Sequence, residues 1–239
     1  MANQLGKIIS LVQLKGGVGR STIATNLAGT LAENARVVLF DCDSPQHTCS
    51  HWLNQRTIQY DIDEVLDLVQ PSTYRSMASN LDRARKEYDY IVIDGPPRVD
   101  GFSRLALAAA DISLFPLGPS AAEIWSIREM LSTIKEASEF KKDFCGRVVW
   151  NRFRGYTRSA QEQAKEARKT LKFPEMRQKL SLRVVYAEAM SEGLTVHEMD
   201  DKVARLEMWS LSSTLQRMLN QRKPGKALTK EDWIDFAKR

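Results

Sequence analysis

The chain has 239 residues, of which 43% are hydrophobic, and carries a formal net charge of +5 at pH 7. This length allows one large domain or two small ones with a real core. No apolar run reaches membrane-spanning length, and the N-terminal stretch lacks the layout of a signal peptide, so we expect a cytoplasmic protein. Three cysteines are too few for a disulfide framework and fit a reducing compartment.

Short apolar runs alternate with stretches of helical spacing along most of the chain. Strands are predicted at residues 7–14, 37–40, 90–93, 112–116 and 147–150. Helices are predicted at residues 21–33, 73–86, 102–110, 120–139, 159–172, 184–191 and 202–220, with Ser120 as an N-cap. Apolar strands that alternate with helices predict an α/β fold, in which a parallel sheet is covered by helices on both faces.

The composition changes near the end of the last predicted helix. Pro224 and Gly225 interrupt that helix, and lysine and arginine are frequent around them. We predict one domain over residues 1–220 and a basic C-terminal tail over residues 221–239, with a short helix around Trp233. Acidic residues accompany the few apolar ones in this tail, so we do not expect it to bind a membrane as an amphipathic helix.

A glycine-rich stretch, KGGVGRST, directly follows the first predicted strand. Such a turn before a helix N-terminus binds anions, because backbone N–H groups point into it and the helix dipole adds a favourable field. Gly16, Gly17 and Gly19 permit the turn and a close approach of the ligand. Ser21 stands where a hydroxyl can ligate Mg²⁺.

The general P-loop pattern has glycine where this chain has Leu14, so the stretch does not match the general form. It resembles instead the deviant Walker A motif of the ParA/MinD family, x-K-G-G-x-G-K-[ST], whose early lysine corresponds to Lys15. The resemblance implies a P-loop NTPase fold that binds ATP and Mg²⁺. It also implies that Lys15 is catalytic, crossing a dimer interface to contact the phosphates held by the other subunit. The nucleotide-binding residues that it implies in the loop are Gly16, Gly17, Val18, Gly19, Arg20, Ser21 and Thr22.

Two acidic segments carry the same resemblance. VVLFDCDSPQ is similar to the family's D-x-D-P-Q segment, which implies that Asp43 positions the attacking water and that Asp41 supports the Mg²⁺ shell. YIVIDGPPR resembles the Walker B strand, which implies that Asp94 reaches Mg²⁺ through water. The resemblance thus gives a metal set of Ser21, Asp41 and Asp94, and a catalytic set of Lys15, Asp43 and Arg20.

Four residues beside the first acidic segment are of the types that bind zinc, namely Cys42, His47, Cys49 and His51. Their spacing is irregular, and the acidic strand end already has an explanation in the resemblance. We therefore interpret them as ordinary loop and helix residues.

The loop and the first acidic segment each depart from the family pattern. Arg20 replaces the usual lysine; it keeps the positive charge but presents a wider, planar group that can still bind phosphate. We therefore predict that nucleotide still binds. A wider group under the loop would shift the γ phosphate, and in-line attack tolerates little displacement, so we predict that hydrolysis is slow or conditional. Ser44 is inserted before the proline of the acidic segment, which makes a role for Gln46 uncertain.

Later segments continue the resemblance, which spans about residues 7–219. AAADISLFPLGPSAAEIW and VVYAEAMSEGLTVHE are similar to stretches of the small ParF-type ParA proteins. The resemblance also places a pair such as Asn151 and Arg152 near the adenine base. Asn151 could instead cap its loop through its side-chain amide.

Positive charge is concentrated in the second half of the chain. ParA relatives bind DNA nonspecifically through basic residues of that half, and such binding needs charge without base reading. The residues that we predict for DNA binding are Lys165, Arg168, Lys169, Lys172, Arg177, Lys179 and Arg183. The alternative is a solvated helix face whose lysines pair with Glu162 and Glu166 at helical spacing.

The resemblance implies a ParA-like ATPase that forms a nucleotide-sandwich homodimer, binds DNA on the nucleoid and positions plasmid or other DNA cargo. Its expected partner is a ParB-like or other small adaptor protein. The alternative function, which Arg20 and Ser44 motivate, is a dimeric scaffold that binds ATP with little hydrolysis and recruits cargo or conjugation machinery.

Overall fold

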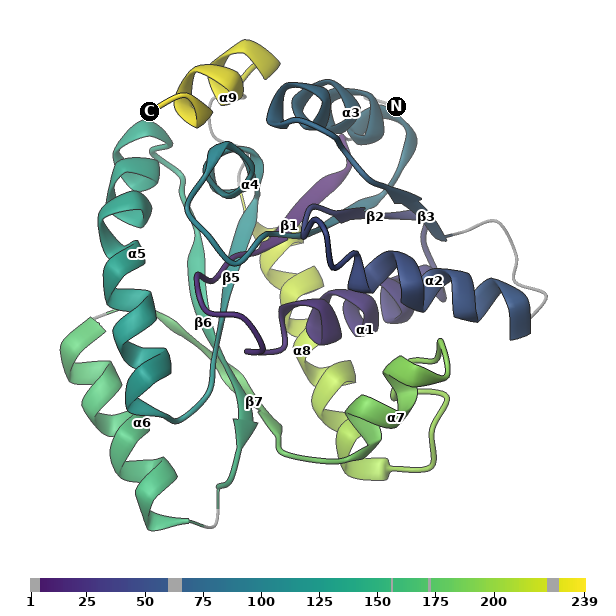
Figure 1. Cartoon of the computed structure of the whole chain (residues 1–239), viewed down its shortest axis with the longest axis vertical. Helices are drawn as coiled ribbons and strands as arrows, with labels where there is room; N and C mark the ends of the chain where they lie inside the picture. The colour runs from purple at the N-terminus through teal and green to yellow at the C-terminus, as the bar shows by residue number, and fades with distance from the viewer. Residues whose placement is uncertain (1–4, 60–65, 156, 172, 223–227) are drawn as a thin grey trace.

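A computed structural model describes residues 5–59, 66–155, 157–171, 173–222 and 228–239 of the chain (Figure 1). Its strands are β1 (Lys7–Leu11), β2 (Val37–Asp41), β3 (Leu66–Val69), β4 (Tyr90–Asp94), β5 (Ile112–Leu117), β6 (Gly146–Phe153) and β7 (Glu175–Ser181). Its helices are α1 (Arg20–Ala32), α2 (Thr48–Gln59), α3 (Tyr74–Glu87), α4 (Gly101–Ala109), α5 (Ala121–Phe140), α6 (Arg158–Leu171), α7 (Val185–Ser191), α8 (Lys202–Gln221) and α9 (Lys230–Ala237).

Within the described residues, seven parallel strands form one sheet in the order β3-β2-β4-β1-β5-β6-β7. The carboxyl ends of β1, β2 and β4 are adjacent at the centre of the sheet, where Asp94 is in register with both Leu11 and Asp41. Ligands of parallel α/β sheets bind at this edge, so the sheet order alone brings the acids beside the glycine loop.

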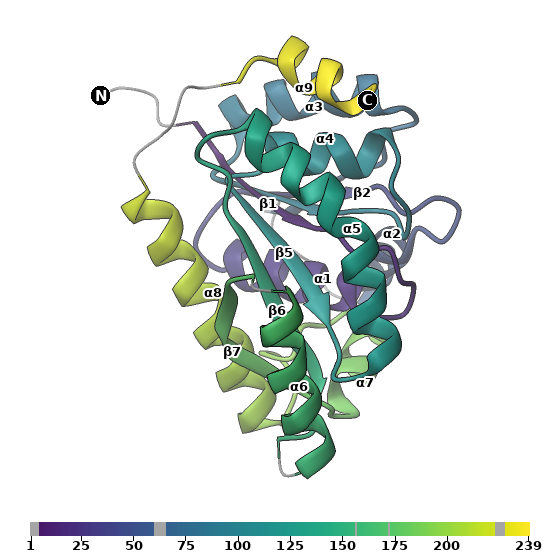
Figure 2. The same cartoon turned by 90° about the vertical axis from the view of Figure 1, so that its left-hand side faces the viewer.

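Helices cover both faces of the sheet (Figures 1 and 2). One face packs against α3, α4, α5, α6 and α9, and the other packs against α1, α2, α7 and α8. Successive strand residues therefore enter opposite cores: Ile8 lies in the first and Ile9 in the second, and both are fully buried. The predicted α/β fold with a doubly covered parallel sheet is confirmed.

Three elements were missed by the sequence prediction, namely α2, β3 and β7. The edge strand β7 reads EMRQKLS, and only Met176 and Leu180 of it are buried, so it lacks the continuous apolar run of the central strands. In α2 the described buried residues are Cys49, Ser50 and Trp52, too few to give a clear helical period. The predicted N-cap Ser120 is confirmed, since its hydroxyl accepts from the Glu123 N–H.

The described end of the segment 221–239 is packed against the rest of the chain. Thr229 caps α9, and this helix lies against α3 and α4 (Figure 2). Trp233 and Phe236 are 2% and 0% exposed, and Phe236 stacks on Phe140 with ring centres 4.9 Å apart. The short helix predicted around Trp233 is therefore present, and it completes one core of the molecule.

Because Trp233 is buried, we expect Trp233→Ala to lower the free energy of unfolding by about 3–5 kcal/mol, the usual cost of removing a large aromatic side chain from a core. The matched control is Trp209→Ala, since 58% of the Trp209 surface is exposed and the change should cost less than about 0.5 kcal/mol. Urea denaturation followed by circular dichroism measures both values. Equal stabilities of the two variants would show that α9 is dispensable.

Candidate functional site

The glycine loop leaves β1 at its carboxyl end and leads directly into α1. Gly17 and Gly19 have φ angles of 72° and 92°, in the left-handed region that favours glycine. A Cβ on Gly19 would lie 2.1 Å from Asn151 Nδ2, so any side chain there would displace the Asn151 amide. A left-handed turn that leads into a helix N-terminus suits an anion, because the first N–H groups of the helix have no partner within it.

Both residues predicted near the base lie at the end of β6, beside this loop. Asn151 is 7% exposed and its amide donates to the Val18 carbonyl at 2.7 Å. Arg152 has a φ of 51°, and its guanidinium pairs with the buried Glu123 at 2.8 Å. Arg152 and Glu123 line a cavity of about 430 Å³ with Arg154. Asn151 thus supports the loop, while Arg152 belongs to a polar cavity behind it.

The side chain of Arg20 turns back under the loop, where only 4% of it is exposed. Its Nε donates to the Gly95 carbonyl at 2.9 Å, and Nη1 donates to the Gln13 and Lys15 carbonyls at 2.7 and 2.9 Å. Its Nη2 pairs with Asp43 Oδ2 at 3.2 Å. Four of the five N–H donors of a guanidinium are thus used within the protein. Arg20 ties the loop to the residues that follow β2 and β4.

The three predicted acids are brought together but differ in how they are satisfied. Asp41 accepts from the backbone N–H and hydroxyl of Ser50, at 2.9 and 2.8 Å. Asp43 and Asp94 each keep one buried carboxylate oxygen, Oδ1, that has no hydrogen-bond partner among the described residues. Asp41 therefore anchors α2 to β2, while Asp43 and Asp94 retain an oxygen for another ligand.

Burial destabilises the ionised form of the Asp94 carboxyl group. It raises the pKa of this carboxyl group to about 6, although the Ser21 hydroxyl and the Arg20 charge act in the opposite direction. Burial also raises the pKa of the Cys49 thiol, which donates to Asp94 Oδ2 at 3.2 Å. A cation beside Asp94 would offset the cost of the buried charge.

These residues fit Mg²⁺ held together with a nucleotide. Carboxylate and hydroxyl oxygens are the ligands that Mg²⁺ prefers, and it commonly takes one or two from the protein and the rest from phosphate and water. Ser21 and the free Oδ1 of Asp94 supply such oxygens. Within the described ranges, no group of three or more His, Cys, Asp or Glu residues could hold a metal by itself.

Functional residues missed by the sequence reasoning lie around the loop and on α2. Gln13 is fully buried; its amide oxygen accepts from the Leu14 N–H and the Ser126 hydroxyl, which fixes the start of the loop. Ser50 and Cys49 hold Asp41 and Asp94 from the first turn of α2. A polar residue at the end of an apolar strand, two positions before Lys15, was the signal that could have identified Gln13. By contrast Gln46, which the inserted Ser44 made uncertain, is exposed.

Comparison with known proteins bears on this arrangement. A family model described as the CobQ/CobB/MinD/ParA nucleotide binding domain matches residues 9–196, which include the glycine loop and all three acids. The chain belongs to the ParA/MinD family. This match confirms the resemblance drawn from the sequence. Members of this family are ATPases.

Named relatives cover the chain to different extents. The Maintenance of carboxysome distribution protein A of Halothiobacillus neapolitanus is 28% identical over 201 residues, which is 83% of this chain and 90% of the relative. The Sporulation initiation inhibitor protein Soj of Bacillus subtilis is 26% identical over 167 residues, 55% of this chain and 66% of Soj. The ParA/MinD relatives thus include proteins named for more than one cellular task.

Solved structures of the family share the fold at low sequence identity. Apo McdA of Cyanothece superimposes with a TM-score of 0.73 at 16% identity, covering 87% of this chain and 99% of McdA. MinD of Pyrococcus horikoshii in complex with Mg-ADP gives a TM-score of 0.71 at 17% identity, covering 90% and 97%. The predicted P-loop NTPase fold of the ParA/MinD type is confirmed.

Outside the nucleotide site, part of the predicted DNA-binding set uses its charge within the chain. Arg168 pairs with Glu175 at 2.8 Å. Lys179 lies over the ring of Phe153, 4.1 Å from its centre, and burial together with the Arg168 charge lowers the pKa of Lys179. Both residues are therefore less available to an external phosphate than their sequence positions suggest.

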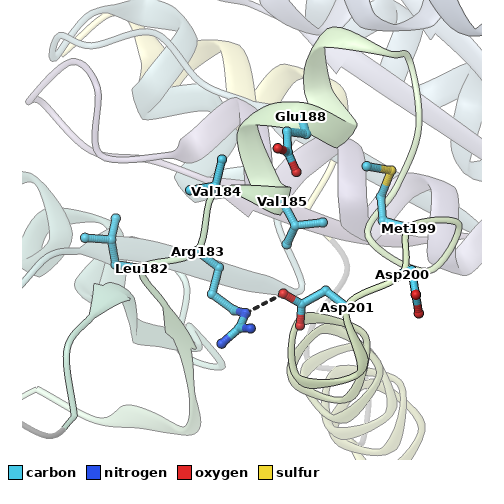
Figure 3. A pocket seen from close by; sticks show the side chains of 8 residues that line it. All are labelled: Leu182, Arg183, Val184, Val185, Glu188, Met199, Asp200 and Asp201. Carbon is cyan, nitrogen blue, oxygen red and sulfur yellow. Dashed lines mark hydrogen bonds and ion pairs between the residues drawn. The ribbon is translucent and has the colours of Figure 1, made fainter.

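Arg183 lines an acidic pocket between the end of β7, α7 and the start of α8 (Figure 3). Its Nε bonds Asp201 at 2.6 Å, while Glu188 and Asp200 lie on the same rim. The pocket has a volume of about 630 Å³. Because Arg183 already pairs with Asp201, its charge is less available to an external phosphate.

The remaining predicted residues are exposed. Lys165 and Lys169 on α6 and Arg177 on β7 make no ion pair with any residue that the structure describes. Arg177 also lines a cavity with Arg217 of α8, which the sequence prediction did not include. Lys172 lies outside the described residues. No helix in the described ranges is long and apolar enough to cross a membrane.

Proposed function

We propose that the chain is a ParA-type ATPase that binds ATP with Mg²⁺ at the glycine loop and closes as a face-to-face homodimer around two nucleotides. The observation that carries the proposal is the site at the carboxyl ends of β1, β2 and β4. There the left-handed turn at Gly17 and Gly19 frames a helix N-terminus, and the unpaired oxygens of Asp43 and Asp94 lie at the neighbouring strand ends.

Each residue of this site has one part in the proposed reaction. The loop amides and the α1 N-terminus bind the phosphates. Ser21 and Asp94 would hold Mg²⁺, which when bound neutralises charge on the phosphates. Asp43 orients the attacking water once its carboxylate is released from Arg20. Lys15, which is partly exposed and makes no ion pair within the described part of the chain, reaches the phosphates of the second subunit.

Arg20 supports the proposal that hydrolysis is slow. Its guanidinium is bonded to three backbone carbonyls and to Asp43, so the cation and the proposed water-positioning group are engaged with each other. Turnover then requires that the Arg20–Asp43 pair opens. A rate set by this opening suits a slow timer between ATP-bound and released states.

We further propose that the ATP-bound dimer binds DNA nonspecifically, associates with the nucleoid in the cytoplasm and positions a cargo through a ParB-like or other small adaptor protein. Two relatives named as chromosome partitioning proteins support DNA as the surface that the dimer binds. The name of the Halothiobacillus relative supports a protein assembly, in place of a plasmid, as a second candidate cargo. The free basic residues that could contact DNA are Lys165, Lys169, Arg177 and Arg217.

The direct test of this function is DNA binding measured by fluorescence anisotropy with ATP, with ADP and without nucleotide. We expect binding only with ATP and Mg²⁺, and with little preference among DNA sequences. Lys165→Ala combined with Lys169→Ala should weaken binding and lower the slope of log K against log salt by about 2, because each lost phosphate contact removes about 0.9.

The control for this prediction is Arg83→Ala, which removes an exposed charge from α3, a helix on the same face of the sheet as α6 but packed beside β4. This variant should keep the wild-type salt slope. Equal binding in the presence of ATP and ADP would contradict the ATP-gated mechanism, and an unchanged slope in the double variant would move the DNA surface away from α6.

The second candidate function is a nucleotide-gated scaffold that binds ATP, dimerises and recruits cargo or conjugation machinery with negligible turnover. The buried Arg20–Asp43 pair favours it. Single-turnover measurements with and without DNA separate the two functions, since a scaffold retains intact ATP throughout.

A further inference from the structure

The first turn of α2 contacts both acidic strand ends of the nucleotide site. Cys49 is fully buried, and its thiol donates to Asp94 Oδ2 at 3.2 Å. The next residue, Ser50, bonds Asp41 through its N–H and its hydroxyl. No role follows for Cys49 from the motifs of the loop or of the strands, so this contact needs its own explanation.

The two oxygens of Asp94 are in different situations. Oδ2 is occupied by the Cys49 thiol, whereas Oδ1 is buried and has no hydrogen-bond partner among the described residues. Hydrogen bonds to a ligating carboxylate fix its orientation, and loss of such a bond commonly costs 10–100-fold in metal affinity or activity. With Oδ2 held, rotation of the carboxylate is restricted and Oδ1 keeps one direction.

We propose that Cys49 is a positioning residue, whose thiol orients Asp94 so that Oδ1 is presented to the Mg²⁺ that accompanies the nucleotide. This inference rests on the proposed function, because it requires a magnesium–nucleotide complex at the glycine loop. Cys49 acts through Asp94 alone. Its place on α2 also means that the metal site depends on a helix outside the loop and the Walker B strand.

A purely structural role for Cys49 predicts a different outcome, and two variants distinguish the roles. Cys49→Ala removes both the donor and part of the buried volume. Cys49→Ser keeps a donor toward Asp94 in an even smaller volume than cysteine. If packing alone matters, both variants should behave alike, whereas orientation of Asp94 predicts that serine retains the wild-type property.

The test measures the Kd of a non-hydrolysable ATP analogue by calorimetry, once with about 1 mM free Mg²⁺ and once in EDTA. For Cys49→Ala we expect the Mg²⁺-dependent gain in affinity to fall by about tenfold, with the Kd in EDTA within about twofold of wild type. Cys49→Ser should keep most of the gain. Cys145→Ala, which removes a buried thiol before the amino end of β6, should keep all of it.

The outcomes separate the inference from the proposed function. A wild-type protein without any Mg²⁺-dependent gain overturns the proposed function and the inference together. A wild-type gain that persists in Cys49→Ala overturns the inference alone. So does an equal loss in Cys49→Ser, or a loss of analogue affinity in EDTA as large as the loss with Mg²⁺, because each indicates a packing defect.

Discussion

Lys15→Ala is expected to abolish the proposed DNA-stimulated ATPase activity, with a loss on the order of 10²–10³-fold or more. A charge supplied across an interface to a transferring phosphoryl group contributes at least this much. The side chain of Lys15 makes no ion pair within the described residues, so its removal leaves the fold intact. Release of inorganic phosphate at saturating ATP measures the effect.

The control for this prediction is Lys7→Ala, which removes the same charge at the opposite end of β1 and should leave stimulated turnover unchanged. Unchanged turnover in Lys15→Ala would contradict the sandwich mechanism. A mixing experiment is sharper still, because Lys15 is expected to act on the nucleotide of the other subunit.

Lys15→Ala and Asp43→Ala should each be inactive alone and partly active when mixed. A mixed dimer holds one site with an intact Asp43 and an intact Lys15 from its partner. At equal concentrations half of the dimers are mixed and each has one complete site, so about a quarter of wild-type activity should return. Absence of any recovery would place Lys15 in the site of its own subunit.

Arg20→Lys is expected to raise the single-turnover rate of ATP hydrolysis by roughly 10–100-fold. Lysine restores a compact charge for the phosphates, and it cannot keep the contacts that hold Arg20 to Asp43 and to the loop carbonyls. Asp43 is then free to orient water, and small corrections of reacting geometry are worth about this factor. Rapid quench of a preformed ATP complex measures the rate.

The same change should carry a cost in stability. Loss of the buried hydrogen bonds of Arg20 is expected to lower the free energy of unfolding by about 1–3 kcal/mol. Arg56→Lys is the control, since Arg56 is also well bonded, to Glu198, but lies outside the site. A slower Arg20→Lys enzyme would show that arginine is the productive residue here, and the proposed restraint on hydrolysis would be wrong.

The sequence predicted the parts of the fold and site that depend on strong local patterns. The central strands are continuous apolar runs, and Asp41 and Asp94 end two of them, so their meeting at one edge follows from a parallel sheet. Gly17 and Gly19 identify the turn because a positive φ there favours glycine.

The parts that were not predicted depend on contacts between distant segments. Arg20 donates to the backbone carbonyl of Gly95, which lies 75 positions later in the sequence. A backbone acceptor does not depend on the residue type, so the sequence carries no signal for this contact. Cys49 lies 45 positions from Asp94 on a helix with a weak apolar period. Charge counts also do not reveal that Arg168 and Arg183 already have carboxylate partners.

The packing of α9 has a consequence for biosynthesis. Trp233 and Phe236 are synthesised long after α3 and α4, yet they close the core over these two helices. Until residues 229–237 are synthesised, the nascent protein exposes the hydrophobic surface of α3 and α4 that α9 later covers. Chaperones and proteases recognise such exposed hydrophobic surface. Proteins truncated before residue 229 should therefore be degraded. They should not accumulate as inactive fragments that pair with the full-length chain.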